Sequence, residues 1–201
     1  MNFVKIRKIW WLSHACMTYI KQIINLEGRI LQPNRRFLKN YQLEVFNVAT
    51  ISDVSKDLER LTVFISNLSL YSDDVLCKLI VGTWSIQDII SHIMGWDKNF
   101  IKTLNQIINN EEVKLEEHHD VQAFNEASVS FGRKMKPHDL LKEAISQRKQ
   151  LISKLNMVSK SAFTKQFQNS SHTLETFLQN MFIGHDRHHE EQIKNYLEMV
   201  S

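Results

Sequence analysis

Residues that interrupt helices are scarce in this chain, which holds five glycines and two prolines among 201 residues. Glycine and proline are the residues that most often end or break a helix, so long stretches of this chain are free to be helical. Apolar residues make up 43% of the chain and charged residues 23%, which is typical of a globular protein and argues against a disordered one. The shortage of helix breakers therefore predicts an all-α fold.

Cysteine is scarce as well. The two cysteines are Cys16 and Cys77, and neither belongs to a C-x-x-C motif. Two such residues cannot form the disulfide framework of a small secreted protein. Because free thiols persist in a reducing compartment, we expect a cytoplasmic protein.

Several signatures of common protein classes are missing. The chain contains no glycine-rich phosphate loop, no G-x-S-x-G nucleophile elbow and no internal repeat. The apolar run Ile9-Trp10-Trp11-Leu12 is too short to span a bilayer, and no small-residue cleavage site follows it convincingly. These absences argue against a signal peptide and against the enzyme classes that those motifs define.

Positive charge is concentrated at the beginning of the chain. Residues 1–48 hold eight Lys or Arg and two Glu, a formal charge of +6, whereas the rest holds 17 basic and 20 acidic residues, a formal charge of −3. A mildly acidic body is a poor surface for a polyanion. We therefore expect no nucleic-acid partner.

Residues 1–49 are expected to form a basic N-terminal extension to the main domain, residues 50–201. The apolar residues between Ile20 and Leu31 suit a weak amphipathic helix that contacts a membrane surface. The alternative is a segment outside the native protein, produced by a misassigned start codon. Membrane contact is expected only if the extension is genuine, and we assign it no function.

Four long amphipathic patterns follow, each with apolar residues three or four positions apart. They cover about residues 51–71, 85–104, 137–155 and 174–199. Ser85 and Asp88 form the sequence pattern of a capping box at the start of the second helix. A shorter pattern, Val121 to Phe131, lies in the polar connection between the second and third helices. Four long helices with one long crossing predict a four-helix bundle.

Imidazoles interrupt the apolar face of the fourth helix. Its expected inward positions, with His188 at their edge, are Leu174, Leu178, Met181, His185, His189, Gln192 and Tyr196. His185 and His189 lie one turn apart on one face, the spacing that two ligands of one divalent metal ion need, although chance also supplies such pairs. On the second helix, His92 lies at the flank of the apolar face and is the best candidate for a third ligand.

Five further residues are candidates to line a pocket beside this site. Trp84 and Trp96 are expected first as core aromatics, with lining of a substrate cleft as the alternative. His188 is expected at the rim of the metal pair. Gln192 and Asn125 are expected to face the pocket.

Two acidic residues and a histidine pair are expected to lie in solvent. Asp88 and Asp186 are read as surface carboxylates, with orientation of the metal ligands as the alternative. His118 and His119 belong to an acidic loop, where a role as metal ligands is the alternative. No general base is identifiable.

Two segments together resemble the DinB-like (YfiT-like) superfamily. They are Trp84 to Trp96, with the pattern W-S…H-(I/L)…W, and His185 to Gln192, with the pattern H-x-x-x-H-x-x-Q. The match covers about Ile51 to Leu197. The resemblance implies an up-down-down-up bundle in which His92, His185 and His189 hold a divalent metal ion, commonly zinc or nickel.

The resemblance also implies a class of chemistry. The family includes thiol-dependent S-transferases, a maleylpyruvate isomerase that uses a low-molecular-weight thiol, and proteins assigned as metal-dependent hydrolases. A metal-dependent enzyme that activates a thiol or water toward a small electrophilic substrate is therefore expected. The alternative is a non-enzymatic bundle that binds a metal or small molecule, in sequestration, resistance or dimerisation. Bundles of this type can form homodimers.

The middle of the chain is similar to one branch of the family. Phe124-Asn125-Glu126 and the helix after Pro137 look like the ClbS/DfsB-type resistance proteins, which open a reactive cyclopropane without the full metal triad. This chain has all three histidines, which argues against a direct transfer of that activity.

Overall fold

The structure, a computed structural model, describes residues 49–111, 113, 120–167 and 172–200. The expectations for the N-terminal extension up to residue 48, including its membrane contact, lie outside the described residues. The same is true of the acidic-loop residues His118 and His119.

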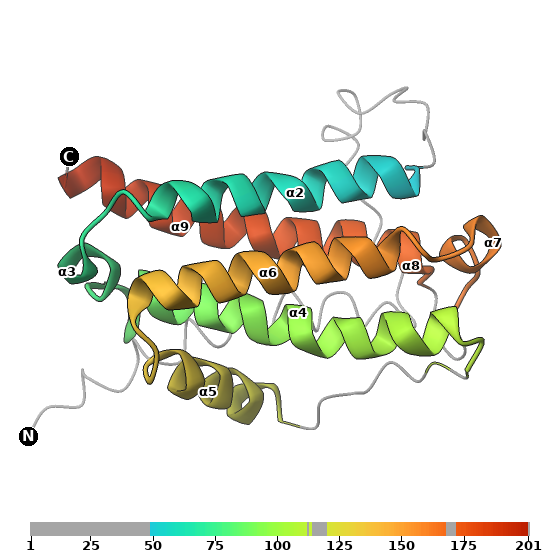
Figure 1. The fold of residues 1–201 in the computed structure, drawn as a ribbon, viewed down its shortest axis with the longest axis horizontal. Helices are drawn as coiled ribbons and strands as arrows, with labels where there is room; N and C mark the ends of the chain where they lie inside the picture. Colours follow the sequence, from blue (N-terminus) through green and yellow to red (C-terminus); the bar gives the residue numbers. More distant parts are fainter. Residues whose placement is uncertain (1–48, 112, 114–119, 168–171, 201) are drawn as a thin grey trace, which may run out of the picture. The chain divides into compact units, whose positions relative to one another are not determined.

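Four long helices form the body of the described chain (Figure 1): α2 (Ile51–Leu68), α4 (Ile86–Ile108), α6 (Pro137–Leu155) and α9 (Gly184–Val200). Helix α6 packs against α2 and α4, and α9 contacts the same two helices. In Figure 1, α2 and α9 run in one direction and α4 and α6 in the opposite one. The predicted all-α, up-down-down-up four-helix bundle is confirmed. Of the described helices, none is both long and apolar enough to cross a membrane.

Shorter elements connect these helices. They are α3 (Asp73–Leu76), β1 (Leu79–Val81), β2 (Trp84–Ser85), α5 (Val121–Gly132), α7 (Lys160–Phe163) and α8 (Leu174–Phe177). Strands β1 and β2 pair antiparallel in a stretch that the sequence marks only as a connection. Gly82, in the turn between them, has a φ of 59°, a conformation that favours glycine. The hairpin leads directly into α4, with Trp84 just before the helix.

Side-chain caps fix where two of the long helices begin. The Ser85 hydroxyl accepts a hydrogen bond from the backbone N–H of Asp88 at 3.1 Å, and the Asp88 carboxylate accepts one from the backbone N–H of Ser85 at 2.9 Å. The predicted capping box is therefore confirmed. Thr50 and Asp53 form a second one at the start of α2.

Helix α5 lies beside α4, outside the four-helix body (Figure 1), and two glycines allow the close approach. A Cβ atom on Gly132 would lie 2.3 Å from the Ser91 hydroxyl, and one on Gly95 would lie 2.3 Å from the Ser128 hydroxyl. Real Cβ atoms do not tolerate such distances. The two glycines therefore set how near α5, which carries Asn125, comes to α4.

The apolar core of the described residues consists of two clusters with polar residues between them. One cluster includes Ile65, Ile89 and Ile193, and the other includes Leu58, Leu104 and Phe182. Along α4, α6 and α9, the residues that separate the two clusters include Asp97, Arg148 and Asp186, all of them buried. We call these three residues the polar layer.

The fourth predicted helix runs without a break from Leu174 to Val200, but it is not α-helical throughout. A π-helical segment, Leu178–Ile183, separates α8 from α9. One extra residue in a helical turn rotates every later residue by about 100° around the axis. The buried positions of α9 are accordingly Asp186, His189, Glu190, Ile193 and Leu197, whereas His185, Gln192 and Tyr196 are only partly buried. On α9, except at His189, the expected inward stripe is thus displaced by one residue, whereas Leu174 and Leu178 before it are buried as expected.

Candidate metal centre

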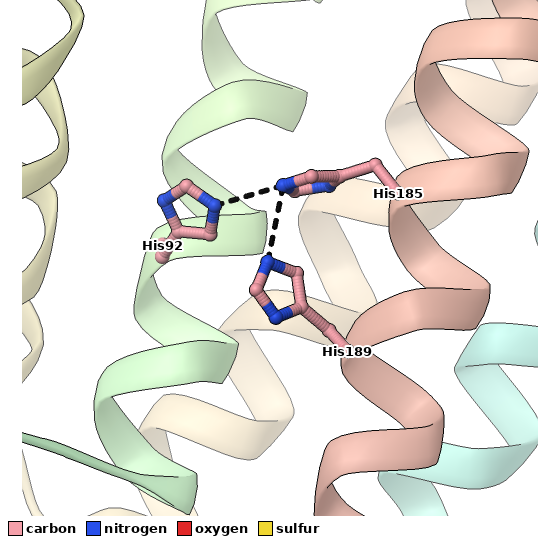
Figure 2. A group of neighbouring side chains, drawn as sticks. All are labelled: His92, His185 and His189. Carbon is pink, nitrogen blue, oxygen red and sulfur yellow. Dashed lines mark hydrogen bonds between the residues drawn. The ribbon is translucent and has the colours of Figure 1, made fainter. Parts of the chain in front are cut away.

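Three imidazoles from two helices meet between α4 and α9 (Figure 2). The Nε2 atom of His185 lies 2.9 Å from Nε2 of His92 and 3.1 Å from Nε2 of His189. Each residue offers one ring nitrogen, and the three nitrogens all lie within 4.8 Å of one another. Zinc–nitrogen bonds of about 2.0–2.1 Å in a tetrahedral site place the ligand nitrogens about 3.3 Å apart, so the described geometry suits such an ion after small adjustments.

Burial keeps the three imidazoles neutral near pH 7. It lowers the pKa of His185 to about 4, helped by the positive charge of Arg148, and that of His189 to about 3, helped by repulsion from His185. Burial also holds the pKa of His92 well below its ordinary value, and repulsion from the other two rings adds to the shift. A neutral imidazole has a free lone pair on one nitrogen, which is the form that binds a metal ion.

Gln192 determines which nitrogen of His189 carries the proton. Its side-chain oxygen lies 2.8 Å from Nδ1 of His189, so this nitrogen donates and Nε2 of the same ring keeps its lone pair. The amide nitrogen of Gln192 in turn lies 3.0 Å from Nε2 of the exposed His188. In the neutral cluster, Nε2 of His189 is therefore an acceptor, and His185 must donate the hydrogen bond to it. The three converging nitrogens then have few N–H donors among them. A cation would satisfy these lone pairs together.

Aromatic side chains and an amide surround His92. The rings of Trp84 and His92 have centroids 4.9 Å apart, and those of Trp96 and His92 lie 6.4 Å apart, edge to face. The indole N–H of Trp96 donates to the side-chain oxygen of Asn125 at 3.2 Å, and Phe124 lies against the same indole, with centroids 4.7 Å apart. Both tryptophans are partly buried. An apolar wall with one amide group therefore adjoins the histidine cluster.

The polar layer lies beside the histidines. Arg148 donates through Nε to Asp97 at 2.8 Å and through its two terminal nitrogens to both oxygens of Asp186. Although burial opposes its charge, the carboxylates of Asp186 and Asp97 raise the pKa of Arg148. Burial raises the pKa of Asp97 to about 7, against the opposing effect of Arg148.

The expectation that Asp88 and Asp186 are solvated is wrong. Asp186 is buried because the π-helical segment turns it toward Arg148. Asp88 is buried because it caps α4 and also accepts two hydrogen bonds from Arg133, at 2.8 and 2.9 Å. Burial disfavours its charge, but the hydrogen bonds from Arg133 and Ser85 hold the pKa of Asp88 below its usual value.

The structure brings the predicted site residues together in two groups. Trp84, Trp96 and Asn125 lie around His92, and His188 and Gln192 lie around His189. Arg148 and Asp97 were not predicted. Arg148 could have been found in the sequence, because it is a charged residue within the apolar stripe of α6.

Two solved structures share the fold. The colibactin self-resistance protein ClbS, crystallised in complex with double-stranded DNA, aligns with a TM-score of 0.63 at 11% identity and covers 74% of this chain and 95% of that chain. The mycothiol-dependent maleylpyruvate isomerase aligns with a TM-score of 0.59 at 12% identity and covers 72% of this chain and 61% of that chain. Likeness at these identities shows the fold alone.

The expectation of no nucleic-acid partner is contradicted by the first of these structures, in which a protein of this fold is bound to DNA. The expectation rested on the formal charge of −3 outside residues 1–48. A summed charge does not describe how basic residues are distributed over a surface, and local basic patches are what contact phosphates. The net charge therefore does not exclude a nucleic-acid partner.

Sequence comparison identifies the family. A comparison with curated proteins finds no significant match. Residues 55–193, well over half of the chain, match the model of the DinB superfamily, and this span contains His92, His185 and His189. The resemblance that the two motifs indicated is confirmed, and the chain belongs to the DinB superfamily.

Proposed function

We propose that the protein is a metal-dependent enzyme that acts on a small electrophilic substrate. His92, His185 and His189 would hold a divalent ion, zinc or nickel, and the cosubstrate would be a low-molecular-weight thiol or water. The observation that carries the proposal is the convergence of three neutral imidazole nitrogens within 4.8 Å of one another, with His92 and His189 buried and His185 partly buried. The mycothiol dependence of a structural relative supports the thiol. Cys77, a free thiol, and the lack of a disulfide framework in the sequence support a cytoplasmic location.

In this proposal, some residues bind the metal ion and others orient its ligands. The three imidazoles supply neutral nitrogen ligands, and Gln192 keeps Nε2 of His189 available by accepting a hydrogen bond from Nδ1. When held by these three imidazoles, a divalent ion would supply the Lewis acidity that lowers the pKa of a thiol or water.

The surroundings of His92 suit a small substrate with an apolar part and a polar group. Trp84, Trp96 and Phe124 offer apolar ring surface next to the cluster. Asn125, held by Trp96, offers an amide that can orient a carbonyl or hydroxyl group. These residues would place the electrophilic atom of the substrate beside the activated thiol or water.

Metal analysis tests the binding part of the proposal. The purified protein is expected to carry about one zinc or nickel ion per chain, and His185→Ala should lose the ion together with the increase in melting temperature that the ion provides. His138→Ala, on α6 and paired with Asp73, is the matched control and should keep the ion. A wild-type protein without a stoichiometric divalent metal, and with the melting temperature of His185→Ala, would refute the metal site.

Turnover separates an enzyme from a binding protein. Metal-loaded protein is incubated with a panel of thiols and electrophiles, and product formation is compared with that of His92→Ala. Turnover that requires His92 would support the enzyme. Binding without turnover across the panel would support the second candidate instead.

The second candidate is a resistance protein that binds a toxic small molecule without turning it over. The likeness to ClbS, a self-resistance protein whose crystal contains double-stranded DNA, supports the role in resistance, whereas the absence of turnover rests on the panel described above. Titration of this chain with a fluorescent DNA duplex at several salt concentrations tests whether it shares that binding. A dissociation constant that rises steeply with salt would indicate contacts with the phosphates.

A further inference from the structure

Arg148 is fully buried, although a charged side chain costs free energy when it is removed from water. As whole residues, Arg148 is 0% exposed and its partners Asp97 and Asp186 are 1% and 6% exposed. The three residues come from three helices, α6, α4 and α9. One guanidinium group therefore connects the two helices that carry the histidine cluster.

Stability alone is a weak reason for such a cluster. Removing charges from water costs several kcal/mol per ion, and well-packed apolar residues often replace buried ion pairs without loss. Moreover, one carboxylate oxygen of Asp97 is buried with no hydrogen-bond partner among the described residues. The best-attested use of a buried polar cluster is to select one arrangement of helices over another.

The alternative arrangement here is a different rotation of α9. Asp186 follows the candidate ligand His185 directly and lies three residues beyond the π-helical segment Leu178–Ile183. Without the extra residue of that segment, α9 would turn by about 100°, and His185 would take the inward position that Asp186 now holds. An imidazole, and no longer a carboxylate, would then face the guanidinium of Arg148.

We infer that Asp186, held by Arg148, is a positioning residue that fixes the rotation of α9 and so turns His185 toward His92. The inference rests on the proposed metal site. Asp186 binds both terminal nitrogens of Arg148, and this two-point contact restricts rotation more than a single hydrogen bond does. Asp97, on α4, accepts a hydrogen bond from Nε of Arg148, and among the described residues no hydrogen bond or ion pair joins it to α9.

The difference between the two carboxylates gives a matched pair of variants. Asp186→Asn and Asp97→Asn each remove one carboxylate partner of the same guanidinium. Only Asp186→Asn weakens the contact between Arg148 and α9, because Asp97 belongs to α4. Zinc affinity, measured by competition with a chelator, is expected to fall about tenfold or more in Asp186→Asn and to stay close to wild type in Asp97→Asn. In cobalt-substituted protein, the visible absorption spectrum should change only in Asp186→Asn. Equal effects of the two variants, or no effect of either, would overturn the inference.

A metal-free measurement separates this inference from the metal site itself. Ring protons of His92 and His185 are expected to show a nuclear Overhauser contact in wild type and in Asp97→Asn, and to lose it in Asp186→Asn. If wild type binds no zinc but the contact follows this pattern, the metal site fails and the positioning role stands. If the contact persists in Asp186→Asn, the positioning role fails even though zinc binds.

A second variant covers the case in which Asp186→Asn does not fold. Arg148→Gln combined with Asp186→Asn removes both charges of this pair, and Asp97, which then lacks Arg148, would be uncharged because burial raises its pKa. A folded double variant with weakened zinc binding and without the His92–His185 contact would support the inference. Wild-type zinc binding in the double variant would overturn it.

Discussion

At the scale of single residues, the histidine cluster depends on which nitrogen of each ring is protonated. Gln192 is the residue that settles this for His189, because its oxygen lies 2.8 Å from Nδ1. The other end of the Gln192 amide contacts His188, which is exposed and is not one of the three converging imidazoles. The two neighbours of the cluster therefore differ in their contacts: Gln192 hydrogen-bonds to His189, whereas His188 hydrogen-bonds to Gln192 and meets the His189 ring only edge to face, with centroids 5.4 Å apart.

We predict that Gln192→Leu lowers zinc affinity by about tenfold or more, since His189 loses the acceptor that fixes its tautomer. His188→Ala is the matched control and should bind zinc nearly as wild type does. Both affinities can be measured by competition with a chromophoric chelator at pH 7.5. Equal affinities of the two variants would contradict the role of Gln192.

We also predict that the metal-free protein loses stability as the pH falls from about 6.5 to 4. The pKa values of His185 and His189 are lowered to about 4 and 3, so the unfolded chain binds more protons than the folded one in this range. Each unit of pKa difference is worth about 1.4 kcal/mol, and the loss should reach a few kcal/mol. Asp97, with a pKa raised to about 7, acts in the opposite direction but is a single group against several imidazoles.

Urea unfolding of the chelator-treated protein at pH 7.5 and pH 5 measures this loss. The midpoint should be lower at pH 5, and His189→Gln, which removes one imidazole, should show a smaller difference between the two pH values. Identical midpoints for wild type at both pH values would contradict the prediction.

At the scale of helices, the features that depend on neighbours in sequence could be predicted, and those that depend on distant residues could not. The capping box of Ser85 and Asp88 and the start of α6 at Pro137 depend on neighbours in sequence, and both are present. The π-helical segment adds one residue without disturbing the local apolar spacing, so an uninterrupted α-helix was expected there. The burial of Asp186 depends on that segment and on Arg148, 38 residues away, which no local pattern indicates.

We predict that Gly132→Ala destabilises the protein by about 1–3 kcal/mol, although alanine favours helices more than glycine does. The new Cβ atom would lie 2.4 Å from Cβ of Ser91, which is fully buried on α4, so the backbones of α4 and α5 would have to separate. Urea unfolding measures the loss. Ser91→Gly combined with Gly132→Ala moves the side chain to the other helix and should recover part of it. A Gly132→Ala variant as stable as wild type would show that α5 is not closely packed on α4.

At the scale of the whole molecule, the described chain places its polar chemistry between two apolar clusters. The sequence motifs predicted which histidines come together, since the spacing on α9 and the flank of α4 are properties of single helices. They could not predict the polar layer, because it exists only once three helices are packed. The expectation of no nucleic-acid partner, which rested on net charge, was wrong for a similar reason. Net charge is a sum over the chain, whereas binding of DNA depends on the arrangement of charges in space.

We predict that a chain without residues 1–48 keeps its metal content and its melting temperature within a few degrees. The three histidines and both apolar clusters belong to residues 49–200, and the family match spans residues 55–193. Ala49 must be retained, because its backbone N–H donates to Glu175 at 2.8 Å. The comparison is a metal analysis and a thermal scan of both chains under the same conditions. Loss of the ion on truncation would show that the first 48 residues take part in the site, because none of the histidines of the cluster has then been removed.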